Sequence, residues 1–164
     1  MNTVTITAST NDQYQRDQKA QWRIARRMSG YVTALERRRR VLSNIVIIYR
    51  DQPAILPVQT TATLGILSEA RRVMLAALAF LQNLHPAETE RIRPYGCMTK
   101  LEALDDLCTQ IILNVAMFAQ VCQSVDPART RLHLEIRAAL PVLLCCYDDT
   151  AAMLAALVER QVQI

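Results

Sequence analysis

The sequence predicts an all-α protein, a four- to five-helix bundle with one long, amphipathic and basic N-terminal helix. Three observations support this fold class. Apolar residues recur every three to four positions over most of the chain, which is the spacing of one face of an α-helix. Only three glycines occur in 164 residues, which disfavours the many tight turns of a β fold. Prolines and capping residues divide the chain at intervals that suit long helices.

The segment from Asn11 to Tyr49 has the clearest helical pattern. When Met28 is placed at heptad position a, the a and d positions from Ile24 to Tyr49 are apolar except at Arg38. We expect this apolar seam to face the core of the bundle. A charged side chain within it must extend to solvent or pair with a carboxylate.

Residues 1–9 are expected to form a flexible N-terminal arm, and residues 10–164 a single helical domain. Apolar side chains alternate with threonines in the arm, which is a strand-like pattern without a partner strand. The alternatives are a tail without fixed structure and an arm that lies on a neighbouring subunit. Thr10 or Asn11 is the expected N-cap of the first helix, which should end before Pro53.

The second helix is expected to run from a cap at Thr60 or Thr61 to about Leu84. One short helical turn should follow Pro86. We interpret His85, which precedes this proline, as a residue at a helix end and not as a ligand.

The third helix is expected between Lys100 and Gln123, because Thr99 and Glu102 have the spacing of a capping box. The fourth should begin with Asp126 as its N-cap and continue from Pro127 to about Gln161. Pro141 lies in the interior of this segment and predicts a kink or a break there. Residues 148–150 provide a possible cap for a separate last helix.

Positive charge is concentrated in the N-terminal helix. Residues 1–50 contain ten Lys/Arg and three Asp/Glu, a balance of +7, whereas the whole chain has a net charge of +4. Six cations occupy heptad positions c and f and form a line of roughly 36 Å on the outer face, which we call the basic stripe. Its members are Arg16, Lys19, Arg23, Arg26, Arg37 and Arg40.

Three interpretations of the basic stripe remain open: a solvated face, a surface for a polyanion, and a surface that docks on acidic protein. The acidic protein could be the remainder of the same chain, a neighbouring copy or another partner. Trp22, at heptad position b, lies beside the stripe. It could stack on a base, fill a pocket of a neighbouring subunit or cover the edge of the bundle.

No catalytic, metal-ligating or cofactor-binding residue is predicted, and we do not expect an enzyme. Neither histidine lies in a metal-binding spacing, and His133 is expected on the surface. Three glycines could hardly build a phosphate-binding loop. The adjacent carboxylates of Asp105–Asp106 and Asp148–Asp149 are expected near helix starts, where they favour the helix dipole.

The five cysteines form no C-x-x-C pair and are expected to be free, mostly buried thiols. Together with the lack of a signal peptide, this predicts a reducing compartment, either the cytoplasm or the interior of a nucleoprotein assembly. No apolar run reaches the roughly 18 residues needed to cross a bilayer, so no membrane span is expected.

These observations favour a non-enzymatic helical assembly protein that self-associates as a homo-oligomer. The basic stripe and Trp22 would contact nucleic-acid phosphates without sequence preference, as in a coat, packaging or accessory protein. The alternative is a protein–protein interaction module, such as an adaptor, inhibitor or chaperone. In that case the basic helix would meet an acidic protein partner.

Overall fold

The computed structural model describes residues 3–162, with side chains from residue 10 to residue 161. This part of the chain contains five α-helices, one short 3-10 helix and no strand, which confirms the all-α prediction. The elements are α1 (Thr3–Asp51), α2 (Pro57–Gln82), α3 (Pro86–Ile92), η1 (Arg93–Tyr95), α4 (Cys97–Val121) and α5 (Pro127–Val162).

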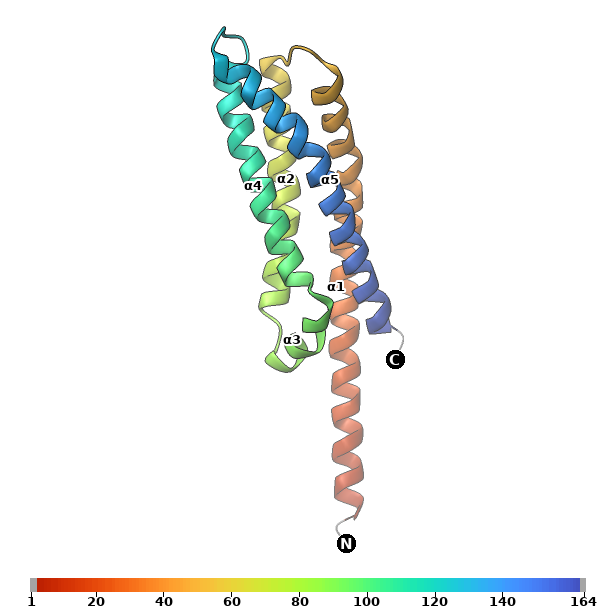
Figure 1. Cartoon of the computed structure of the whole chain (residues 1–164). Helices are drawn as coiled ribbons and strands as arrows, with labels where there is room; N and C mark the ends of the chain where they lie inside the picture. The colour runs from red at the N-terminus through yellow and green to blue at the C-terminus, as the bar shows by residue number, and fades with distance from the viewer. Residues whose placement is uncertain (1–2, 163–164) are drawn as a thin grey trace.

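The four long helices lie side by side in an elongated bundle (Figure 1). Helix α1 packs against α5 and α2, and α4 packs against α2 and α5, so each long helix has two neighbours. The short elements α3 and η1 lie at one end of the bundle, between α2 and α4. Beyond this end, α1 continues alone (Figure 1).

Helix α1 begins at Thr3, seven residues before the expected cap at Thr10. Residues 3–9, assigned by sequence to a flexible arm, therefore have helical backbone, while residues 1–2 lie outside the described part of the chain. Extending an existing helix adds one hydrogen bond for each residue that becomes ordered. An isolated strand has no neighbouring strand with which its backbone could form hydrogen bonds. The strand-like alternation of residues 3–9 therefore does not decide their conformation.

The apolar seam of α1 is buried only where α1 lies within the bundle. From Ile24 to Tyr49 its apolar a and d residues are buried, except that Tyr31 is half-buried. Arg38, the one charged residue of the seam, pairs with Glu69 of α2 at 3.4 Å and remains partly exposed, as expected. Towards the N-terminus, residues at the same heptad positions are not covered by another helix, and the Tyr14 side chain is 54% exposed.

The starts of α2 and α4 differ from those predicted. Helix α2 begins at Pro57, and Thr60 is a buried residue of its first turn whose hydroxyl donates to the Pro57 carbonyl. Helix α4 begins at Cys97, two residues before the expected capping box at Thr99. Gly96 is its N-cap and has a φ of 66°, a left-handed conformation that side chains disfavour.

Helix α5 starts as predicted, with the carboxylate of Asp126 accepting a hydrogen bond from the Ala128 backbone N–H at 2.8 Å. It then runs without a break through Pro141 and through residues 148–150, so no separate last helix exists. Figure 1 shows a change of direction near the middle of α5, in line with a proline that removes one helical hydrogen bond. Leu140 and Leu143 are buried on either side of the proline and fix both halves against the bundle.

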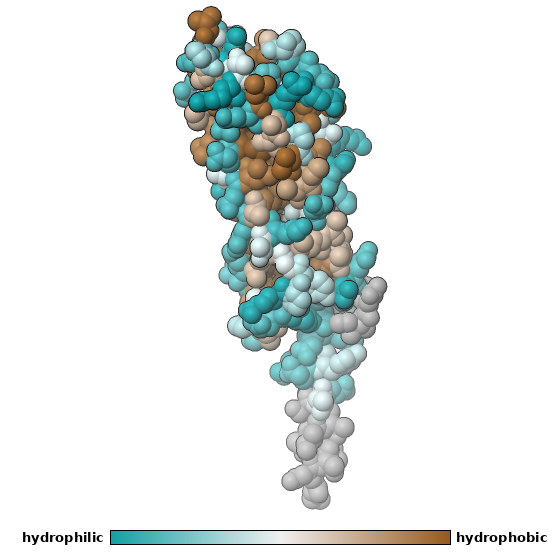
Figure 2. All heavy atoms as spheres, viewed as in Figure 1, coloured by the Kyte–Doolittle hydropathy of each residue, from teal (hydrophilic) through white to brown (hydrophobic). Residues whose placement is uncertain are grey.

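The expectation that no segment could span a membrane is wrong. Residues Pro127–Gln161 form a helix that is long and apolar enough to cross a bilayer, with a mean hydropathy of 1.5 over 18 residues. Only 28% of that window is buried inside the bundle. Asp148 and Asp149 interrupt the apolar run, which is why a search for an unbroken stretch overlooked it. Figure 2 shows hydrophobic residues gathered where α4 and the first half of α5 lie.

Candidate polyanion-binding surface

The basic stripe lies on the outer face of α1. Burial of the a and d positions against the other helices turns positions c and f towards solvent, and all six cations of the stripe are exposed. None of the six has a carboxylate within ion-pair distance in the described part of the chain, residues 10–161. The stripe is therefore a line of uncompensated positive charge.

Several other arginines of the bundle are paired with carboxylates. Arg39 of α1 contacts Asp148 of α5 at 2.6 Å, and Arg71 of α2 contacts Asp105 of α4 at 2.7 Å. The hydrogen bond to Asp148 raises the pKa of Arg39. Arg38 and Arg39, near the seam, therefore pair with acidic residues of the same chain, whereas the cations of the basic stripe do not. Both carboxylates lie inside helices, so their predicted place near helix starts is wrong.

Glu69 of α2 is the carboxylate that neutralises two further arginines. Arg72 donates to it at 2.9 Å, and Arg38 reaches the same oxygen at 3.4 Å. The hydrogen bond from Arg72 is the main cause that lowers the pKa of Glu69, and Arg38 adds a smaller electrostatic effect. Both arginines therefore share the Oε2 atom of Glu69.

The basic stripe has two parts. Gly30 and Thr33 occupy the intervening c and f positions, and the Thr33 hydroxyl donates to the Ser29 carbonyl of the preceding turn. Arg26 and Arg37 are consequently separated by about 16 Å along the helix axis. The N-terminal part contains four of the six cations and reaches beyond the end of the bundle.

A groove of about 1140 Å³ lies along the N-terminal part of the stripe, where α1 passes α2 and α5. Lys19, Trp22, Arg23 and Arg26 of the predicted site line it, whereas Arg16, Arg37 and Arg40 lie outside it. The remaining lining residues are Ala25, Arg27, Ser29, Gly30, Tyr31 and Ala34 of α1, Arg72, Val73 and Ala76 of α2, and Val158 of α5. Most side chains where the three helices meet are small, so they do not fill the groove.

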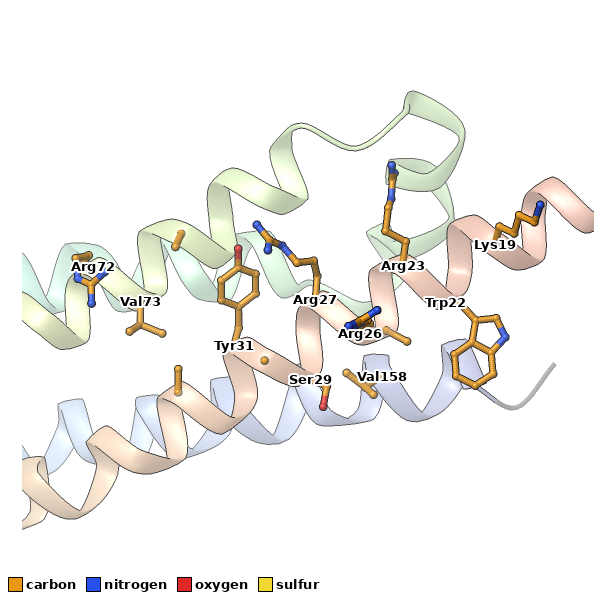
Figure 3. A pocket seen from close by; sticks show the side chains of 14 residues that line it. Lys19, Trp22, Arg23, Arg26, Arg27, Ser29, Tyr31, Arg72, Val73 and Val158 are labelled. Carbon is orange, nitrogen blue, oxygen red and sulfur yellow. The ribbon is translucent and has the colours of Figure 1, made fainter.

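The lining residues divide between the two sides of α1. Figure 3 shows Arg27 directed towards α2, Arg23 directed towards the segment that follows α2, Trp22 directed towards the end of α5, and Arg26 between them. Trp22 is 60% exposed. The structure thus brings the indole and three cations of the predicted site to one groove, with Trp22 and Arg23 on opposite sides of α1.

Arg27 and Tyr31 also line this groove, although neither was predicted as a site residue. The Arg27 guanidinium lies 6.0 Å from the centroid of the Tyr31 ring and 5.8 Å from that of Phe80. The two rings are 6.2 Å apart in a tilted arrangement. Their heptad positions, g for Arg27 and d for Tyr31, indicated the direction of each side chain but not their contact with Phe80 on another helix.

The two histidines have structural roles. His85 is the N-cap of α3, as predicted for a helix-end residue, and its Nδ1 accepts from the Ala87 N–H at 3.2 Å. His133 is half-buried, not on the surface as expected, and its ring packs against Tyr49 and Phe118. Its Nε2 lies 3.1 Å from the Tyr49 carbonyl oxygen. No group of three metal-ligating side chains occurs among residues 10–161.

The cysteines are free, as expected, but not uniformly buried. Cys97, Cys108 and Cys122 are buried, Cys146 is half-buried and Cys145 is exposed, so core packing was a wrong expectation for Cys145. Burial raises the pKa of the Cys97 and Cys108 thiols to about 11. These two thiols are therefore protonated and poorly nucleophilic near neutral pH.

Comparison with protein-family models, with curated proteins and with solved structures finds no match for this chain.

Proposed function

We propose that this chain is a non-enzymatic helical protein that binds nucleic-acid phosphates without sequence preference through the basic stripe of α1. One observation carries the proposal: six aligned cations are exposed and have no carboxylate partner among residues 10–161, whereas Arg38 and Arg39, nearer the seam, are paired. A line of roughly 36 Å presents several positive charges to one polymer at once. Arginine at five of the six positions suits bidentate contacts with phosphate oxygens.

Binding of this kind releases counterions, so its salt dependence measures the number of phosphates that are neutralised. Six contacts give a slope of log K against log salt of about −5 for duplex DNA and about −4 for a single strand. Affinity should then fall by a factor of several hundred or more between about 50 and about 200 mM salt. Fluorescence anisotropy of a labelled, random-sequence oligonucleotide measures this slope directly.

The variant that tests the stripe replaces Arg16, Arg23 and Arg26 with glutamine. These side chains are exposed and lie on a helix, where glutamine has nearly the same propensity as arginine, so helicity by circular dichroism should not change. With three cations left, the slope should fall by about half and binding at low salt should weaken at least tenfold.

A charge-matched control replaces the exposed Arg129, Arg131 and Arg137 of α5 with glutamine. Both variants lower the net charge of +4 by three, but only the first removes charge from the stripe. Equal loss of affinity in the two variants would indicate a diffuse effect of net charge and would contradict the proposal.

The groove favours a second candidate function. Its small apolar residues beside several cations would also suit an amphipathic, acidic helix of another protein, as in an adaptor, inhibitor or chaperone. In that case an acidic helical peptide would bind at low salt, while random oligonucleotides would not. The anisotropy titration separates the two functions, because only the first requires affinity for any oligonucleotide.

Self-association is part of the same proposal. Leu134, Val142 and Cys145 of α5 are exposed, and such an apolar face is suited to contact with a second copy. Sedimentation velocity over a range of protein concentrations should then detect a dimer or higher oligomer. A monomer at every concentration would remove self-association from the proposal and leave phosphate binding untouched.

A further inference from the structure

The groove beside α1 combines three properties that seldom occur together: positive charge, an exposed aromatic ring and an apolar lining. Its volume of about 1140 Å³ exceeds that of a typical pocket for one small molecule, about 300–1000 Å³. Its lining residues on α1 run from Lys19 to Ala34, about 22 Å along the helix, so the groove is long enough for a chain-like ligand.

The charge of the groove selects an anion. Lys19, Arg23, Arg26, Arg27 and Arg72 line it, and no lining residue carries a carboxylate. Arg72 alone is paired, with Glu69 at 2.9 Å. The other four cations have no carboxylate partner among residues 10–161 and retain their charge for a ligand.

The apolar surface of the groove separates one kind of polyanion from another. Ala25, Val73 and Val158 line it, and none of them can hydrogen-bond to a phosphate through its side chain. A duplex encloses its base faces within the stack and presents phosphates and base edges. An unpaired strand presents phosphates together with free base faces, which stack on aromatic and apolar side chains.

Trp22 is the aromatic ring available for such stacking. The face of Tyr31 is already in contact with the Arg27 guanidinium at 6.0 Å, whereas the Trp22 side chain is 60% exposed. Arg26 lies between the indole and the side of α1 to which Arg23 points, so a base on Trp22 would place its own phosphate nearest the Arg26 guanidinium (Figure 3).

We infer that the groove binds single-stranded nucleic acid, with a base stacked on Trp22 and the flanking phosphates on Lys19, Arg23, Arg26 and Arg27. This inference rests on the proposed function of the basic stripe and names its substrate class. Arg16, outside the groove, extends the phosphate contacts along α1. Stacking is tolerant of sequence because every base has a π face, so the preference is for strand form and not for a base sequence.

Tryptophan fluorescence tests the inference directly, because Trp22 is the single tryptophan of the chain. The protein is titrated with oligothymidylate, with a duplex of the same length and with inorganic polyphosphate, which carries charge but no bases. Oligothymidylate should quench the fluorescence strongly and bind most tightly. Polyphosphate should bind with weaker quenching, because it leaves the indole unstacked.

Replacement of Trp22 by alanine removes the stacking partner. Affinity for oligothymidylate, measured by anisotropy, should fall about 5- to 150-fold, whereas affinity for polyphosphate should not change. Trp22→Phe should restore part of the loss. Tyr14→Ala is the matched control, because Tyr14 is an exposed aromatic residue of α1 outside the groove and should have no effect.

The outcomes distinguish this inference from the proposed function. If no polyanion binds at about 50 mM salt, the proposed function fails and the inference fails with it. If duplex and single strand bind equally and Trp22→Ala changes neither, the inference fails while phosphate binding by the stripe stands. An acidic helical peptide that quenches Trp22 occupies the groove. If such a peptide binds without displacing the oligonucleotide, the oligonucleotide binds outside the groove and the inference is overturned.

Discussion

Leu42 and Tyr14 occupy the same heptad position of α1 but differ in their surroundings. The Leu42 side chain is 2% exposed, whereas the Tyr14 side chain, nearer the N-terminus of α1, is 54% exposed. A comparison of Leu42→Ala with Tyr14→Ala therefore tests where the apolar seam contributes to stability.

Leu42→Ala should lower the free energy of unfolding by about 2–5 kcal/mol, because it removes buried methyl and methylene groups and leaves a cavity. For a chain of this size, each kcal/mol shifts the Tm by about 2–4 °C, so the expected decrease is about 4–20 °C. Tyr14→Ala should change the free energy by less than about 0.5 kcal/mol, as is usual for exposed positions. Denaturation by urea, followed by circular dichroism, measures both values.

Two results would refute this reasoning. A loss of stability in Tyr14→Ala equal to that in Leu42→Ala would mean that the N-terminal part of α1 is buried, for example against a second copy. A Leu42→Ala variant that melts like the unchanged protein would mean that the seam does not face the core. A dilution series of Tyr14→Ala distinguishes burial between copies from burial within one chain, because only the former depends on protein concentration.

Glycine replacements should have opposite effects at two sites. Gly65→Ala should raise the free energy of unfolding by about 0.4–1 kcal/mol, because the site is helical and nothing lies within 4 Å of an added Cβ atom. Gly96→Ala should lower it by about 1–2 kcal/mol, because its φ is 66°. Thermal melts check both. The raised pKa of Cys97 and Cys108 also predicts that stability falls as pH rises from about 9 to about 11. The unfolded chain loses these protons first, and a Cys97→Ala, Cys108→Ala double variant should have a smaller slope of stability against pH.

The local pattern of the sequence was sufficient for several features of the fold. Heptad positions from Ile24 to Tyr49 predicted the buried face of α1, and positions c and f predicted the exposure of all six stripe cations. Asp126 capped α5 as expected. These features depend on the direction of a side chain from its own helix and on the backbone of the next few residues, both of which are encoded nearby in the chain.

The same pattern did not indicate how far burial extends. Periodicity is equally consistent with a buried Tyr14, yet no other helix reaches that part of α1. Predicted helix starts were also wrong where packing competed with a capping signal. Helix α4, for example, begins at the buried Cys97, two residues before the predicted cap at Thr99. A capping signal contributes about 1 kcal/mol, and burial of an apolar residue contributes a similar or larger amount.

The sequence by itself determined the all-α class, the apolar seam and the line of exposed cations, because each follows from helical periodicity. Only the tertiary structure decided which charges are neutralised and where the groove lies. Arg39 and Asp148 are 109 residues apart, and the groove exists only because residues of α1, α2 and α5 meet at one place. Contacts between distant segments depend on how helices are arranged in space, and the periodicity of any one helix contains no record of its neighbours.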